Sequence, residues 1–204
     1  DFTESIIALN SAIRGANCGD IQAAFDHRLL TDIEEARGIT VDDPFQWTLF
    51  RNVGYELGSR FVRYFFARVE HFIADEAGLT AESSYNLVRN RGHKHGHHVE
   101  HVLANNEENQ AFFDDEEEFI RERNRLGALV LLKGSDNQSS RNEPYQHKLK
   151  TYSHAPNLTA TLTRDFYHCN PGFGDLMQKH DLDFHPIDHF DSEAIEDRHK
   201  LYFE

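Results

Sequence analysis

Residues 99–103 read VEHVL, and residues 125–152 read RLGALVLLKGSDNQSSRNEPYQHKLKTY. The apolar runs 99–103 and 126–132 are short and bounded by polar residues, which is typical of β-strands. The residues Gly134-Ser135-Asp136 indicate a turn after the second run. A helix over about 138–150, broken near Pro144, is expected to follow. The fold prediction depends on this order of strand, loop, strand and helix.

Such an order predicts a ββα-metal core of the HNH (His-Me finger) type, whose chemistry needs few residues. His101, at the end of the first strand, is predicted to be the general base, since an ordinary histidine is largely neutral at working pH. Glu100 and Asn137 are predicted to hold one Mg²⁺ or Mn²⁺, because oxygen ligands suit hard cations. That cation would neutralise charge on a scissile phosphate. The competing interpretations are a structural histidine at 101, a solvent-facing glutamate at 100 and a helix cap at 137.

The same stretches resemble the C-terminal nuclease domain of GmrSD-type modification-dependent restriction proteins. That family reads approximately I-E-H-I-L-P, then R-L-G-N-L-T-L-L, then N, a further N near P-F, and K and Y. The matching positions are Glu100, His101, Leu103, Arg125, Leu126, Gly127, Leu129, Leu131, Leu132, Asn137, Asn142, Pro144, Lys148 and Tyr152. The closing Ile195-Glu196-Asp197-Arg198 resembles the family's last helix, so the resemblance covers about residues 55–204.

The resemblance implies a metal-dependent DNA endonuclease of a bacterial anti-phage restriction system. Lys148 is then a candidate for contacting phosphate or the transition state, with an exposed helix cation as the alternative. Asn142 would position the site, and Arg125 would support it or form a surface ion pair. Phage-defence nucleases such as SspE share this domain behind a nucleotide-handling N-terminal domain. We therefore expect DNA, such a domain of the same protein and possibly a second copy of the chain as partners.

Two departures from the family pattern leave a second interpretation open. Ala128 stands where the family has an asparagine that usually forms a structural hydrogen bond, and Ala104 replaces a proline. The alternative function is therefore a catalytically weakened HNH-like domain that acts as a helical DNA-docking or interaction module.

The rest of the chain favours an α+β fold that is mainly α. Residues 1–90 form a helical region, with an N-cap at Asp20, a helix starting at 42–44 and the strongest helix at 58–74. The aromatic stripe of that helix is expected to face the core. Residues 91–204 form the nuclease domain, with its motif core at 99–152. A polar loop is expected at 89–98, an acidic helix at 111–125 and irregular structure at 153–185, and Asp191-Ser192 is expected to cap a last helix. The stripe consists of Phe61, Tyr64, Phe65, Val69 and Phe72.

Composition limits the function further. The 204 residues carry a formal net charge of −14, which is unfavourable for binding DNA phosphates. Seven acidic residues are concentrated in 107–118, and without them the motif segment 91–152 is basic. No apolar run is long enough for a membrane helix, so no membrane partner is expected.

Cys18 and Cys169 form no CxxC motif, which predicts two buried thiols and a cytoplasmic setting. The histidines at 93, 95, 97 and 98 match no standard zinc spacing and are expected to belong to a loop. Because the chain begins with Asp1, we read it as a fragment of a longer protein.

Overall fold

The computed structural model describes residues 2–38, 40, 43, 45–92, 94–140 and 143–204. The chain divides into two compact units, 1–50 and 51–204. The first unit contains α1 (Phe2–Ile13), α2 (Cys18–Arg37) and α3 (Trp47–Phe50). The N-cap of α2 is Asn17 rather than Asp20: its side chain accepts a hydrogen bond from the Asp20 N–H.

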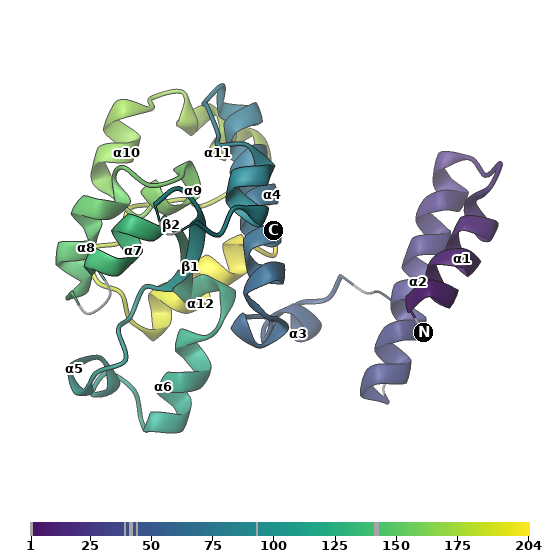
Figure 1. Cartoon of the computed structure of the whole chain (residues 1–204), viewed down its shortest axis with the longest axis horizontal. Helices are drawn as coiled ribbons and strands as arrows, with labels where there is room; N and C mark the ends of the chain where they lie inside the picture. The colour runs from purple at the N-terminus through teal and green to yellow at the C-terminus, as the bar shows by residue number, and fades with distance from the viewer. Residues whose placement is uncertain (1, 39, 41–42, 44, 93, 141–142) are drawn as a thin grey trace. The chain divides into compact units, whose positions relative to one another are not determined.

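The second unit is a small sheet surrounded by short helices. Figure 1 shows its two strands between α4 on one side and α7 and α8 on the other. Its elements in chain order are η1 (Tyr55–Leu57), α4 (Ser59–Ala77), η2 (Tyr85–Arg89), β1 (His97–His101), α5 (Glu107–Gln110), α6 (Glu116–Arg123), η3 (Leu126–Ala128), β2 (Leu129–Lys133), α7 (Gly134–Ser140), α8 (Tyr145–Tyr152), α9 (Asn157–Ala160), α10 (Arg164–Cys169), α11 (Phe173–His180) and α12 (Ser192–Leu201).

The fold class is confirmed: α+β and mainly α, with one antiparallel pair of strands. β1 pairs with β2 from His97 opposite Lys133 to His101 opposite Leu129. Several boundaries differ from those predicted. β1 starts two residues earlier, so His97 and His98 belong to the strand rather than to a loop. The predicted turn at 134–136 is the start of α7, because the chain turns directly from the strand into a helix.

Further differences concern the flanks of the core. The predicted acidic helix at 111–125 corresponds to the shorter α6, which α5 precedes, and the region 153–185 contains α9, α10 and α11. The cap at Asp191 is confirmed, since its side chain accepts from the Ala194 N–H. Both cysteines are exposed, so the prediction of buried thiols was wrong. Among the helices of the described residues, none has both the length and the apolar character needed to cross a bilayer.

α4 is the helix predicted with most support, and it exists, but it buries a different face from the one expected. Phe61, Tyr64 and Phe72 are exposed by 37, 56 and 39%. The buried side instead consists of Val62, Arg63, Phe66, Ala67, Glu70, Ile73 and Ala74. Two charged residues occupy that side because distant backbone groups satisfy them, and three of the five stripe residues are left exposed.

A buried carboxylate fixes α4 to α9. Glu70 accepts hydrogen bonds from the backbone N–H groups of Asn157 and Leu158, at 2.9 and 2.8 Å, in the first turn of α9. Those N–H groups have no partner within the helix, so the carboxylate acts as a cap from another element. Burial raises the pKa of Glu70 and these hydrogen bonds act against that rise.

Candidate active site

Glu100 and His101 lie at the end of β1, and their side chains have different neighbours. Adjacent residues of a strand point to opposite faces of the sheet. Glu100 contacts Lys148 of α8, and His101 contacts Tyr55 of η1 and Asn124, which follows α6. The dipeptide therefore contributes to two different environments, one on each side of the strand.

His101 is held by an amide and an aromatic ring. Its Nε2 lies 2.8 Å from Asn124 Oδ1, and its ring centroid lies 5.1 Å from that of Tyr55. Burial lowers the pKa of His101 to about 4, with smaller contributions from the charges of Arg123 and Lys148. The imidazole is therefore neutral at physiological pH.

The contact with Asn124 also determines which ring nitrogen can act as a base. An amide oxygen can only accept a hydrogen bond, so Nε2 carries the proton and Nδ1 carries the lone pair. Nδ1 of His101 has no hydrogen-bond partner among the described residues and is not one of their buried unpartnered atoms. Water can therefore reach it.

A close backbone contact places both neighbours of His101. The Tyr55 N–H donates to the Asn124 carbonyl at 2.7 Å, and Gly54 forms an isolated antiparallel bridge with Arg125. A Cβ atom on Gly54 would lie 2.0 Å from the Asn124 carbonyl oxygen, so this approach requires glycine. Asn124, Tyr55 and Gly54 could not be identified from the sequence, since a lone glycine and a tyrosine far from the motif give no signal.

On the other side of β1, Glu100 forms a buried ion pair. Lys148 Nζ lies 2.8 Å from Glu100 Oε1, with side-chain exposures of 0 and 9%. The same ammonium donates to the His101 carbonyl oxygen at 3.1 Å. Lys148 is thus not the exposed cation of the alternative interpretation; it joins α8 to the last two residues of β1.

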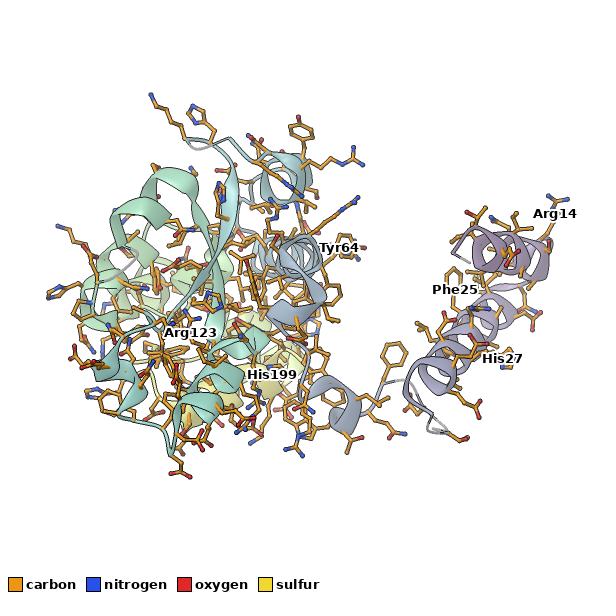
Figure 2. All side chains as sticks on the ribbon, turned by 60° about the horizontal axis from the view of Figure 1, so that its bottom comes forward. Arg14, Phe25, His27, Tyr64, Arg123 and His199 are labelled. Carbon is orange, nitrogen blue, oxygen red and sulfur yellow. The ribbon has the colours of Figure 1, made fainter. Side chains whose placement is uncertain are left out.

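The C-terminal helix α12 supports the turn that leads into β2. Arg198 Nη1 donates to the Gly127 carbonyl at 2.5 Å, and the Gly127 N–H donates to His199 Nδ1 at 3.3 Å. A Cβ atom on Gly127 would lie 2.2 Å from the Ile195 carbonyl oxygen. Figure 2 shows His199 in the lower part of the second unit, on the C-terminal helix. The sequence run from Arg125 to Leu132 is therefore fixed by a helix some seventy residues later in the chain.

A comparison with family models matches residues 39–204 to the GmrSD restriction endonucleases, C-terminal domain. The chain belongs to this family. It is accordingly a restriction nuclease domain whose expected substrate is DNA. No curated protein and no solved structure matches the chain.

Within this GmrSD C-terminal domain the other predicted site residues are placed as follows. Asn137 is half-buried on α7, whose start hydrogen-bonds the opposite end of the strands, from Gly134 N to the Gly96 carbonyl. Among the described residues Asn137 makes no hydrogen bond to His101 or Glu100. Asn142 lies outside the described residues.

Arg125 forms ion pairs rather than pointing into the site. Its guanidinium lies 2.8 Å from Glu122 and 2.5 Å from Glu196, with 11% of the side chain exposed. Ala128, which replaces the family's asparagine, is fully buried in the core. The amide that reaches His101 in this GmrSD domain is that of Asn124.

The donor atoms fit a divalent cation in kind, since Glu100 and Asn137 offer the oxygens that Mg²⁺ prefers. Among the described residues no group of three or more His, Cys, Asp and Glu side chains could hold a metal ion. Any bound cation would therefore take most of its ligands from water and substrate phosphate, as Mg²⁺ commonly does. Glu100 would have to coordinate the cation while its carboxylate also accepts a hydrogen bond from Lys148.

Proposed function

We propose that this GmrSD-type domain is an HNH-type, metal-dependent phosphodiesterase that nicks or cuts DNA in a bacterial anti-phage restriction system. The proposal rests on the surroundings of His101. Its protonated Nε2 donates a hydrogen bond to Asn124 Oδ1, and its Nδ1 is accessible to water. A neutral imidazole so oriented can take a proton from water without first losing one of its own.

The reaction step requires only this proton transfer and an attack on phosphorus. Nδ1 of His101 accepts a proton from a water molecule, and the resulting hydroxide oxygen bonds to phosphorus. The bond from phosphorus to one sugar oxygen breaks, and that oxygen leaves with the electron pair. Mg²⁺ or Mn²⁺ held by Glu100 and Asn137 would neutralise the developing charge.

The pKa of His101 makes it a weak base in the substrate-free domain. A general base is most effective when its pKa lies near the working pH. Burial is the main cause of the value of about 4, and the nearby cation Arg123 adds to it. A phosphate anion beside the ring raises the pKa, since a negative charge favours the protonated imidazole. His101 thus becomes more basic as DNA binds.

Lys148 is proposed as a positioning residue. It is fully buried and bridges Glu100 to the backbone of His101, so it fixes the end of β1. A direct contact with phosphate, as the sequence suggested, would require this buried side chain to leave both partners.

The competing proposal is a weakened domain that docks on DNA without cutting it. Ala128 and the net charge of −14 favour it. Supercoiled plasmid incubated with Mg²⁺ or Mn²⁺ separates the two, with His101→Ala as the matched variant. Nicking that needs both the metal and His101 supports the nuclease. Equal, negligible nicking by both proteins, in this chain and in a longer protein containing it, overturns it.

A further inference from the structure

A groove lined by exposed aromatic side chains runs between α4 and η2. It has a volume of about 790 Å³, and its lining includes Phe61, Tyr64, Tyr85 and Leu57. Tyr64 and Tyr85 are exposed by 56 and 65%. Figure 2 shows Tyr64 on the outer side of the second unit. Phe61 and Tyr64 belong to the stripe that the sequence placed in the core, whereas Tyr85 does not, and all three rings are exposed in the second unit.

The charge of the groove is opposite to that of the chain. Its lining contains Arg60 and Arg89 and no acidic residue. Residues 83–99 contain no Asp or Glu but three basic residues, and residues 59–69 also contain three basic residues and no acid. In a chain with 35 acidic residues, these two basic segments form a surface suited to an anion.

A buried arginine beside the groove strengthens this conclusion. Arg63 is 3% exposed and donates to the backbone carbonyls of Ser59 and His97. It has no carboxylate partner among the described residues, whereas Arg60 and Arg91 are close enough to lower its pKa, after the larger effect of burial. Two further guanidinium groups therefore lie near that of Arg63, and an anion bound among them would reduce the repulsion that they exert on it.

One residue that lines the groove lies in the same turn as a residue that contacts the candidate base. Leu57 lines it and belongs to η1, the same single turn as Tyr55, whose ring packs against His101. A nucleic-acid strand bound in the groove would therefore lie close to the imidazole of His101. A strand bound elsewhere on the domain would not.

We propose that this aromatic groove binds an unpaired segment of the DNA strand, with bases stacked on Tyr64 and Tyr85 and phosphates held by Arg60 and Arg89. The DNA identity rests on the proposed function. Aromatic faces with arginines between them suit single strands, because paired bases inside a duplex cannot stack on a protein ring. A duplex would use only the arginines.

Binding can be tested without cleavage by using His101→Ala protein in EDTA. Fluorescence anisotropy with a labelled 20-nucleotide single strand and its matching duplex compares Tyr64→Ala and Tyr85→Ala with Phe112→Ala. Phe112 is exposed by 67% and lies outside the groove, which makes it a matched control. Each tyrosine variant is expected to weaken single-strand binding about tenfold and to change duplex binding little.

A second measurement uses salt. Arg60→Gln and Arg89→Gln should each reduce the slope of log affinity against log salt by about 0.7 for the single strand. Arg121→Gln, an exposed arginine paired with glutamates on α6, is the control and should leave the slope unchanged.

The results distinguish this inference from the nuclease proposal. Tyrosine variants that bind the single strand as tightly as Phe112→Ala overturn the inference, even if the wild type nicks plasmid. Tyrosine variants that lose self-association but keep DNA affinity also overturn it, since a second copy then fills the groove. Aromatic-dependent binding without any nicking supports the inference and removes only the nuclease.

Discussion

Lys148→Met should be among the most destabilising single changes in the second unit. It keeps the length of the side chain but removes the cation that lies 2.8 Å from Glu100 Oε1, leaving a carboxylate that is only 9% exposed. Removing one partner of a buried ion pair costs about 3–5 kcal/mol. For a domain of this size that corresponds to a decrease in melting temperature of roughly 6–20 °C.

A double variant tests the cause. In the double variant Glu100→Gln, Lys148→Met neither charge of this pair remains, so its free energy of unfolding should exceed that of Lys148→Met alone. The interaction energy from the double-mutant cycle should be about 1–3 kcal/mol. Lys150→Met, an exposed position on the same helix, is the control and should change stability by less than about 0.5 kcal/mol.

Urea unfolding followed by circular dichroism is the appropriate assay. The single tryptophan, Trp47, lies in the first unit, so its fluorescence would not report on the ion pair. If Lys148→Met lowers the free energy of unfolding by less than about 1 kcal/mol, the reasoning is refuted, because a buried carboxylate without its partner should destabilise the fold by more than that.

Three further outcomes are expected. Since the pKa of His101 is lowered to about 4 in the folded state, the unfolded state binds more protons between that value and about 6.5. The contribution of His101 to the stability of the folded state is therefore complete above pH 6.5 and decreases as the pH falls toward 4. An NMR titration of the folded protein with a His101 midpoint near 6.5 would contradict this. Gly54→Ala should cost about 2–4 kcal/mol in urea unfolding and disturb the His101 resonance, because the new Cβ meets the Asn124 carbonyl at 2.0 Å. Gly174→Ala, where no atom lies within 4 Å, should not, and equal effects would count against the close-contact argument. Plasmid nicking should stop in EDTA and return with Mn²⁺, and persistent nicking in the chelator would exclude metal dependence.

The sequence predicted the strand pair, the break at Pro144 and the capped last helix because these depend on local signals. It placed the wrong face of α4 in the core because an aromatic stripe is also the pattern of a binding surface. The buried face carries Arg63 and Glu70, whose partners lie 34 and about 88 residues away. No local pattern shows that such charges are satisfied.

For the site, the motif identified Glu100 and His101 but not their surroundings. Asn124 is recognisable only through its contact with His101, which spans 23 residues. Lys148 looked like a surface cation because helical spacing does not reveal a carboxylate on another element. The missing information in each case was a contact between distant segments.

The hydrogen bonds between α12 and Gly127 have a consequence for synthesis of the chain in the cell. The carbonyl of Gly127 and its partner Arg198 are separated by 71 residues, so a ribosome that has just made β2 has not yet made the helix that supports its turn. The emerging chain already contains His101 but not the support behind it. The turn that leads into β2 can therefore reach its final conformation only after α12 has been synthesised, 71 residues later.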